Sequence, residues 1–266
     1  MTAPKRLAKL PLSVFIITLN EEDRIAQSVL SVIDWVDEVI VVDSGSTDRT
    51  IERAEDLGAK VVHHDWPGYG EQKRYGEDLC RNGWLLNIDA DEEITPALRD
   101  EIIALFKPVP DTDICKLEIV DVYPHLSEAK SWAYGYWQYR LYDRSKGRFS
   151  TSTVHDTVRP SAEARIHVLK GKVNHRSFKT IAFAVDKMNR ISSMQRDDML
   201  DRKRKIPAWR LLTEFPFAFF KGYVLRKHCL YGYWGFVLAY NYAFSRHLRV
   251  AKMYEAQLMA DGGEQD

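Results

Sequence analysis

Three acidic residues follow a short apolar run near the middle of the chain. The run, Trp84 to Ile88, is predicted to be a buried strand, and Asp89, Asp91 and Glu92 come directly after it. Carboxylates at the end of a buried strand destabilise the fold unless a cation or hydrogen-bond donors compensate them. Two aspartates separated by one residue offer hard oxygen ligands, which suit Mg²⁺ or Mn²⁺ carrying a phosphate-bearing substrate. The alternative is a solvated acidic loop that leads into a helix capped by Thr95.

Polar residues also follow the first two predicted strands. The apolar run Leu12 to Leu19 ends in the polar segment Thr18 to Glu22, and the run Glu38 to Val42 is followed by Asp43 to Asp48. In a parallel sheet, ligands bind at the carboxyl ends of the strands. The three polar segments therefore converge on one predicted site. The chain contains neither G-x-G-x-x-G nor G-x-x-x-x-G-K-[ST], which argues against a dinucleotide enzyme and a P-loop ATPase.

Helical periodicity separates these strands. An apolar stripe from Ile25 to Val36 predicts an amphipathic helix, a second helix ends before Gly58, and a third spans Glu71 to Cys80. Strands that alternate with helices predict an α/β fold, with a mostly parallel sheet flanked by helices. A helix from Thr95 to Phe106 and a strand from Ile114 to Tyr123 are expected to follow.

Composition limits the classes of function. The 266 residues carry a formal net charge of zero, so the chain has no general attraction to nucleic acid. The three cysteines are widely spaced, so neither a disulfide framework nor a zinc site is expected, and a reducing compartment is favoured. The apolar run near the N-terminus lacks a cleavage site of small residues and is expected to be a strand rather than a secretory signal.

Three motifs carry a resemblance to a known family. In order along the chain they are SVFIITLNEED, VDEVIVVDSGSTDRT and WLLNIDADEEIT, and the stretch GYGEQKRYGEDL links the last two. Together they resemble the family 2 glycosyltransferases of the GT-A fold, within the branch that adds glucose or a similar sugar to the lipopolysaccharide core. The resemblance implies a GT-A-like, Rossmann-like domain with a helical C-terminal extension.

The resemblance also implies a nucleotide-diphosphate sugar as donor and Mg²⁺ or Mn²⁺ as cofactor. The loop after the first strand would lie along the nucleotide, Asp43 would contact the base, and Asp89 would lie near the ribose. Asp91, together with Asp89, would bind the metal that bridges the diphosphate. Lys73 and Arg74 could add positive charge there, with a solvated helix face as the alternative for at least one of them. The full set of residues expected at the nucleotide-sugar is Thr18, Asn20, Glu21, Asp43, Ser44, Lys73, Asp89 and Ala90.

The acceptor side is expected to depend on His155 and Asp156. The resembled branch carries His-Glu at this place, so the carboxylate here is one methylene shorter. Asp156 would act as the general base toward the acceptor hydroxyl, and His155 would orient it. The alternative is that Asp156 only caps a turn, with Asp121 as a weaker candidate for the base. His175 is assigned no metal role, but it matches a histidine of the branch's Gly-x-x-x-His stretch, so an acceptor-side role is open.

The C-terminal third combines basic and aromatic residues. A predicted helix over Ile181 to Arg202 is followed by the basic run Arg202 to Lys205, and His228 to Ser245 contains no Lys, Arg, Asp or Glu. The stretch from His228 to Ser245 is barely long enough to span a membrane. An interfacial anchor on an anionic membrane surface is therefore predicted, with an internal packing cap as the alternative. Nucleic-acid binding is a less well supported function for this region, because its basic residues do not alternate with aromatic residues on a sheet.

The expected organisation is a glycosyltransferase domain over residues 1–180 and a helical region over 181–266. The domain divides into a nucleotide-sugar half, 1–106, and an acceptor half, 107–180. The predicted function is inverting sugar transfer to a lipopolysaccharide-core or other lipid-linked glycan, in the cytoplasm on the inner face of the cytoplasmic membrane. The alternatives are transfer to a polyprenyl phosphate, a non-catalytic sugar-nucleotide-binding protein, and a phosphatase that uses Asp89 as nucleophile.

Overall fold

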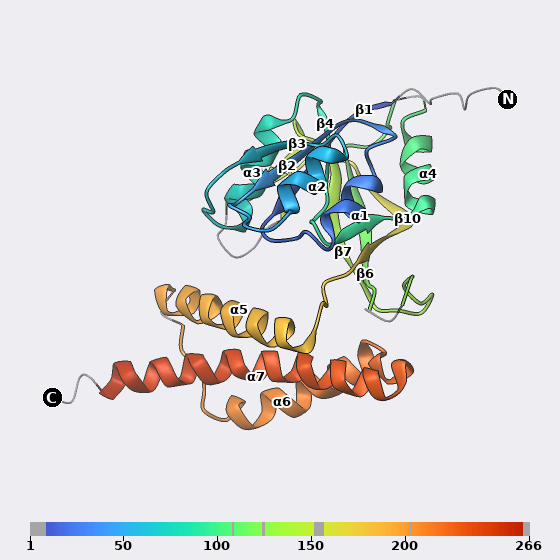
Figure 1. The fold of residues 1–266 in the computed structure, drawn as a ribbon. Coiled ribbons are helices and arrows are strands. Elements are labelled where there is room, and N and C mark those ends of the chain that lie inside the picture. The colour runs from blue at the N-terminus through green and yellow to red at the C-terminus, as the bar shows by residue number, and fades with distance from the viewer. Residues whose placement is uncertain (1–8, 108, 124–125, 152–156, 203, 263–266) are drawn as a thin grey trace. The chain divides into compact units, whose positions relative to one another are not determined.

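The computed structural model describes residues 9–107, 109–123, 126–151, 157–202 and 204–262 (Figure 1). The chain forms two compact units. Unit 1 comprises Met1–Ala129 and Gly135–Ser177, and unit 2 comprises Lys130–Tyr134 and Phe178–Asp266. The main junction at Ser177 lies close to the boundary predicted at residue 180, but unit 2 also takes a short segment from the region assigned to the first domain.

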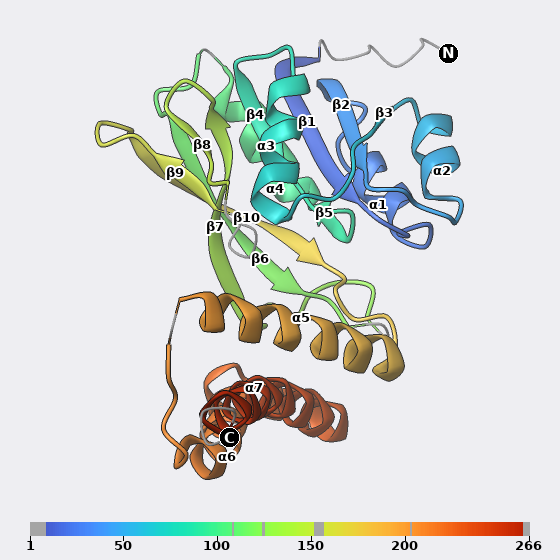
Figure 2. The ribbon, with the colours of Figure 1, turned by 90° about the vertical axis from the view of Figure 1, so that its left-hand side faces the viewer.

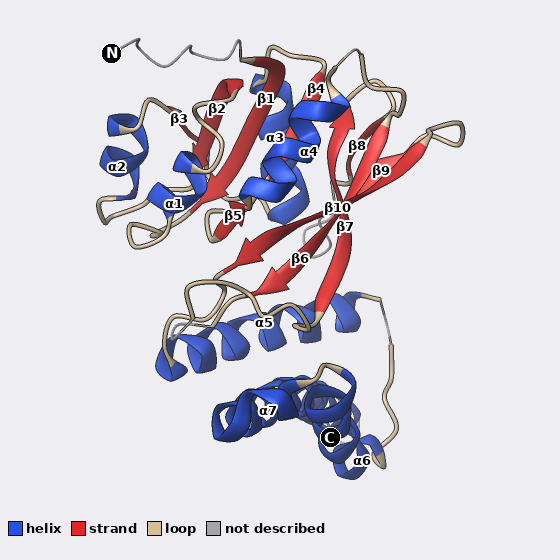
Figure 3. Cartoon of the chain, turned by 90° about the vertical axis from the view of Figure 1, so that its right-hand side faces the viewer, coloured by secondary structure: helices blue, strands red, loops and turns tan. Residues whose placement is uncertain are grey.

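Unit 1 is built on an eight-stranded sheet in the order β3-β2-β1-β4-β7-β6-β10-β5. The first four strands are parallel and alternate with helices along the chain (Figure 3). These elements are β1 Leu10–Thr18, α1 Ile25–Leu30, β2 Val36–Asp43, α2 Thr50–Asp56, β3 Lys60–His63, α3 Tyr69–Leu79 and β4 Trp84–Asn87. The carboxyl ends of these four strands therefore share one edge, as the sequence pattern predicts.

The second half of the sheet is mixed. Strand β7 runs antiparallel to both β4 and β6, β10 is parallel to β6, and the short strand β5 pairs antiparallel with β10. A separate two-stranded sheet, visible in Figure 2, joins β8 and β9. The bounds are β5 Glu92–Ile94, α4 Pro96–Leu105, β6 Ile114–Asp121, β7 Gly135–Asp143, β8 Gly147–Phe149, β9 Val158–Pro160 and β10 Ile166–His175. The predicted α/β fold class is confirmed, with antiparallel strands added to the parallel core.

The sheet is buried on both faces. Val14 and Ile16 of β1 belong to one core with α1 and α4, while Phe15 and Ile17 belong to another core on the opposite face. Successive side chains of a strand point to opposite faces, so a continuous apolar run such as β1 requires cover on both sides. Helix α3 covers the second face so closely that a Cβ on Gly76 would lie 2.8 Å from the Phe15 ring.

One local prediction is wrong, and so is the alternative of a solvated acidic loop leading to Thr95. The apolar stripe ending at Val36 does not form one helix, because α1 ends at Leu30 and Val36 is the first residue of β2. Glu92–Ile94 is not part of a loop but the edge strand β5, paired with β10. In both places, pairing with a strand from another part of the chain determines the local structure. The pattern of apolar residues along the sequence does not reveal such pairing. The predicted cap is confirmed: Thr95 Oγ1 accepts a hydrogen bond from Leu98 N.

Unit 2 is helical. It contains α5 Ile181–Asp201, α6 Arg210–Phe220, the π-helical turn η1 Lys221–Leu225, the short 3-10 helix η2 His228–Tyr231 and α7 Gly232–Gly262. Thr180 caps α5, since its hydroxyl accepts a hydrogen bond from Phe183 N. Helices α6 and α7 pack through aromatic rings, with the Phe215 and Tyr240 centroids 5.2 Å apart. Within the described ranges, none of the helices combines the length and apolar character needed to cross a membrane.

The close packing of α4 on β10 yields a prediction about stability. A Cβ on Gly171 would lie 2.4 Å from Leu98 Cα, so Gly171→Ala forces the backbones of α4 and β10 apart. We expect the free energy of unfolding to fall by about 1 to 3 kcal/mol, the usual cost of overpacking. Gly83→Ala is the matched control, because nothing lies within 4 Å of its added Cβ. Urea denaturation measures both; equal midpoints for the two variants would contradict the predicted contact.

Candidate active site

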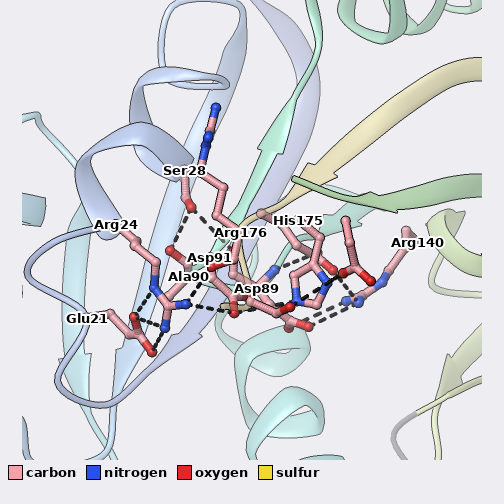
Figure 4. Close-up of polar contacts among 12 residues, drawn as sticks. Glu21, Arg24, Ser28, Asp89, Ala90, Asp91, Arg140, His175 and Arg176 are labelled. Carbon is pink, nitrogen blue, oxygen red and sulfur yellow. Dashed lines mark hydrogen bonds and ion pairs between the residues drawn. The ribbon is translucent and has the colours of Figure 1, made fainter. Parts of the chain in front are cut away.

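The acidic segment lies at the carboxyl end of β4, between β4 and β5. Figure 4 shows Asp89 and Asp91 side by side, with basic side chains approaching from other elements. The turn is held by its own side chains and by its neighbours: Glu92 accepts a hydrogen bond from Asp89 N at 2.9 Å, and Arg176 N donates to Asp91 O at 2.8 Å. Ala90 is buried, and its carbonyl accepts a hydrogen bond from Ser28 Oγ. The segment is therefore a fixed turn rather than a solvated loop.

Two buried cations compensate Asp89. Lys73 Nζ on α3 lies 2.8 Å from Asp89 Oδ1, and Arg140 Nη2 on β7 lies 3.0 Å from Oδ2. The side chains of Lys73 and Arg140 are only 1% and 3% exposed, whereas Asp89 is 30% exposed. Burial by itself raises the pKa of Asp89, but Arg140 and Lys73 outweigh it and hold the pKa well below its usual range. Asp89 is therefore ionised and oriented by both cations.

Glu92 shares the same guanidinium. Its side chain is fully buried, and Glu92 Oε1 lies 3.0 Å from Arg140 Nη2. Burial raises the pKa of Glu92, and the attraction of Arg140 offsets only part of that effect. Arg140 also donates to Asn87 Oδ1, so one side chain contacts the end of β4, the turn and the start of β5.

Asp91 faces a different pair of cations. Its Oδ2 lies 3.3 Å from Arg24 Nη1 and 3.5 Å from His175 Nε2. Burial raises the pKa of Asp91, but His175 and Arg24 outweigh it and hold the pKa at about 2. The other ring nitrogen of His175, Nδ1, lies 3.0 Å from Asp121 Oδ1. Burial lowers the pKa of His175, yet Asp121 and Asp91 together raise it to about 10, so an imidazolium bridges two carboxylates.

The loops after β1 and β2 are tied to each other. Asn20 adopts a left-handed backbone conformation, with φ of 54°, and its side chain accepts a hydrogen bond from Thr47 N. Glu21 N donates to Thr50 Oγ1, and the Glu21 carboxylate holds Arg24, whose Nη1 also donates to Arg176 O. The first loop is therefore linked to the acidic turn through Arg24. Thr18 lies at the end of β1, where its buried Oγ1 has no hydrogen-bond partner among the residues that the structure describes.

Asp43 and Ser44 lie at the end of β2. The Asp43 carboxylate is fully buried and accepts hydrogen bonds from Gly45 N and from both the amide and the hydroxyl of Ser46. Ser44 Oγ accepts a hydrogen bond from Gln72 on α3. The Asp43 carboxylate therefore stabilises the turn that follows β2. Its predicted contact with the nucleotide base stays a prediction.

The structure brings most of the predicted residues to one edge of unit 1, but not all of them can be placed. His155 and Asp156 lie outside the described residues. Sequence reasoning missed Arg24 and Arg140 as members of the site. It named Glu92 in the acidic segment without giving it a role, and it did not place His175 beside Asp91. The available signal was weak: Arg140 is the one basic residue of an aromatic-rich strand, but its acidic partners lie about fifty residues earlier in the chain.

The sequence matches a known family over the same region. The family model described as glycosyl transferase family 2 matches residues 13–170, which is more than half of the 266 residues. The chain belongs to glycosyl transferase family 2. The predicted resemblance is confirmed, and the GT-A-like α/β fold class agrees with the sheet of unit 1. The described site of this family 2 glycosyltransferase lies within the strands and loops that the match includes, apart from the last residues of β10.

Curated relatives align with nearly the whole of this family 2 protein. An uncharacterized glycosyltransferase of Rickettsia felis is 40% identical over 256 residues, covering 93% of this chain and 90% of the relative. The lipopolysaccharide core biosynthesis glycosyltransferase LpsC of Rhizobium meliloti is 28% identical over 258 residues, covering 94% of each chain. The similarity to both relatives thus includes unit 2 as well as the family domain.

Solved structures provide a weaker likeness. The crystal structure of S. aureus TarS has a TM-score of 0.44 and 19% identity, covering 69% of this chain and 39% of that chain. The glucosyl-3-phosphoglycerate synthase of Mycobacterium tuberculosis, solved with Mn²⁺, UDP and glucosyl-3-phosphoglycerate, has a TM-score of 0.42 and 19% identity, covering 69% of this chain and 78% of that chain.

The donor set of the family 2 site fits a divalent ion that arrives with a diphosphate. In the described ranges no group of three or more His, Cys, Asp or Glu side chains forms a complete metal site. Mg²⁺, however, is usually held by one or two carboxylates together with substrate phosphates and water. Asp91 and His175 can supply an oxygen and a nitrogen ligand, provided that the imidazolium gives up its proton. Asp89, predicted as a second oxygen ligand, has both oxygens in ion pairs with Lys73 and Arg140.

The sharing of Arg140 yields a prediction about stability. Arg140→Met leaves the buried Glu92 carboxylate without its cation and removes one of the two cations of Asp89. We expect a loss of about 3 to 5 kcal/mol in the free energy of unfolding, as for other buried pairs that lose one partner. Arg81→Met, which removes a solvent-exposed partner of Asp37, is expected to cost less than about 1 kcal/mol. Thermal and urea unfolding compare the two variants; a similar cost for both would exclude Arg140 as the main charge compensator.

Proposed function

We propose that this family 2 glycosyltransferase moves a sugar from a nucleotide-diphosphate sugar to a hydroxyl group of a lipopolysaccharide-core or other lipid-linked glycan. The observation that carries the proposal is the convergence of Asp91, its partner His175 and the two cations of Asp89 at the carboxyl ends of the strands. This edge combines a carboxylate for a metal with buried cations that keep the neighbouring Asp89 ionised. The similarity to LpsC supports the choice of acceptor class.

The donor half of the proposal rests on charge. Asp91 and His175 would hold Mg²⁺ or Mn²⁺, which when bound neutralises the diphosphate leaving group as a Lewis acid. Lys73 and Arg140 hold Asp89 in one orientation, and its 30% exposure leaves it accessible to a ribose hydroxyl. Thr18, whose hydroxyl has no hydrogen-bond partner among the described residues, ends β1, and the loop residues Asn20 and Glu21 follow it, where the nucleotide is expected.

The acceptor half rests on the sequence resemblance. In an inverting transfer, the acceptor oxygen attacks the anomeric carbon while the bond from that carbon to the diphosphate oxygen breaks. Asp156 would take the proton of the acceptor hydroxyl, and His155 would orient it, although both lie outside the described residues. The competing base, Asp121, is 37% exposed at the end of β6, but its Oδ1 already pairs with the His175 imidazolium. That pairing already engages one oxygen of Asp121, so Asp121 is the less available candidate.

The predicted location is the inner face of the cytoplasmic membrane, with the protein attached peripherally. The basic run Arg202 to Lys205 and the aromatic residues after it support attachment to an anionic surface. The phosphatase alternative loses its support, because both Asp89 oxygens are held by cations and the chain belongs to a transferase family. Transfer to a polyprenyl phosphate and sugar-nucleotide binding without catalysis become outcomes of the tests below.

The metal assignment predicts donor binding that depends on Asp91. Calorimetry with UDP- and GDP-sugars is expected to show binding to the wild-type protein with Mn²⁺ or Mg²⁺, and weak binding after chelation. Asp91→Asn removes a charge from a hard-cation site, so metal-dependent affinity should fall by about a hundredfold or more, above the loss typical of outer-shell changes. Asp100→Asn on the exposed face of α4 is the control and should bind like the wild type. Unchanged affinity in a folded Asp91→Asn protein would exclude the metal role.

The base assignment predicts a loss of transfer without a loss of donor binding. Asp156→Asn should lower the rate of transfer to a glycan hydroxyl by on the order of a hundred- to ten-thousand-fold, the usual contribution of a general base. Asp156→Glu, which restores the residue type of the resembled branch, should retain much of the activity. Normal transfer by the Asn variant would move the base to Asp121 or indicate an acceptor that is already anionic, such as a polyprenyl phosphate. Donor binding without any transfer by the wild type would favour a non-catalytic protein.

A further inference from the structure

Unit 2 carries an apolar face that its own helices leave uncovered. Leu212, Phe217 and Phe220 of α6 are 82%, 70% and 55% exposed, and the exposed residues continue into η1 with Val224 and Leu225. Monomeric soluble proteins rarely leave so many large apolar side chains together in water. The face therefore requires a partner.

The exposure is not a sign of poor packing in α6. Ala218 is buried, and the Phe219 ring lies 5.4 Å from Phe236 of α7. At about 100° per residue, Phe220 lies nearly opposite Ala218 on the helix, and Leu212 and Phe217 flank it on either side. Helix α6 is thus apolar on two sides, one packed against α7 and one exposed, which differs from an ordinary amphipathic surface helix.

Positive charge is concentrated in the same part of the chain as this face. From Arg202 to Arg249 the chain contains ten lysines and arginines and a single acid, Glu214, which gives a formal charge of nine positive, in a protein whose total is zero. Glu214 is already paired inside unit 2, with Arg210 Nη2 at 2.5 Å and Arg246 Nε at 3.2 Å. The exposed Lys221 follows directly after α6, and the exposed Lys227 comes shortly after η1. An apolar face on a segment with this excess of cations is complementary to a surface that is apolar inside and anionic outside.

We propose that the exposed face of α6 and η1 is a docking surface for an anionic lipid bilayer. Leu212, Phe217 and Phe220 enter the boundary between headgroups and acyl chains, and Lys221 and Lys227 meet the headgroup phosphates. The docking is interfacial, in keeping with the lack of a membrane-spanning helix in the described ranges. The inference deepens the peripheral-membrane part of the proposed function and rests on it, and it identifies the partner as the lipid surface.

Flotation of the full-length protein with lipid vesicles tests the proposal. Wild-type protein should float with phosphatidylcholine vesicles that contain phosphatidylglycerol, and binding should weaken at high salt and without the anionic lipid. The triple variant Leu212→Ser, Phe217→Ser, Phe220→Ser should lower the vesicle-bound fraction at least about tenfold, because the apolar anchors are lost. The pair Lys221→Glu, Lys227→Glu should abolish the preference for phosphatidylglycerol while leaving the helices intact by circular dichroism.

Two control variants match the chemistry at sites away from this face. Val109→Ser removes an exposed apolar side chain from unit 1, and Lys60→Glu reverses an exposed charge at β3. Both should float like the wild type. Equal flotation of the triple variant and the wild type would overturn the proposal. So would a wild-type protein that ignores vesicles but sediments as a dimer that the triple variant dissociates, since the face would then join two copies of the chain.

The same variants separate this inference from the proposed activity. The triple variant should bind a nucleotide-sugar with wild-type affinity, because the substitutions lie in unit 2 and the donor residues lie in unit 1. Loss of donor binding by Asp91→Asn with normal flotation supports both ideas independently. Normal flotation by a wild-type protein that binds no donor would refute the proposed function and leave the docking surface standing.

Discussion

The Arg140 guanidinium lies between two carboxylates, and the acidic end of β4 depends on it. Glu92 is completely buried, and water cannot stabilise its charge, so only a cation and hydrogen bonds can do so. Arg140 contacts Glu92, Asp89 and Asn87 at once, while Lys73 approaches Asp89 from α3. The negative charge at this edge is thus stabilised by cations from two other elements. The unfavourable free energy of burying several carboxylates together is offset by Arg140 of β7 and Lys73 of α3.

A second set of contacts joins the remaining parts of the site. Arg24 links Glu21, Asp91 and the Arg176 carbonyl, and His175 links Asp91 to Asp121 at the end of β6. Apart from the local Arg24–Glu21 pair, each connection crosses between elements distant in sequence. The loop after β1, the acidic turn and the ends of β6 and β10 are therefore joined by direct side-chain contacts within unit 1. A divalent ion bound at Asp91 would enter an electrostatic network in which positive charge already balances each carboxylate.

The sequence by itself determined the family and the fold class. Three ordered motifs sufficed for the family through their resemblance to its members, and the polar residues after the apolar runs indicated one edge of a parallel sheet, where the structure places the carboxyl ends of the strands. The cap at Thr95 and the left-handed Gly58 after α2 were predictable for a local reason: both depend on backbone geometry within one turn of a helix. The sequence showed that the C-terminal region is rich in aromatic residues. It did not show which of them lie on the exposed face of α6 and η1.

Only the tertiary structure decided which charges meet. The antiparallel register that pairs Leu86 of β4 with Leu141 of β7 brings Arg140 to the acidic turn, and the register of β10 on β6 sets His175 beside Asp121. Such pairings join residues that are fifty or more positions apart, and neither periodicity nor spacing encodes them. The same limit explains why Val36 was predicted to extend a helix although it begins β2. A residue's own neighbours determine its local preference, whereas burial and charge compensation depend on strands contributed from elsewhere in the chain.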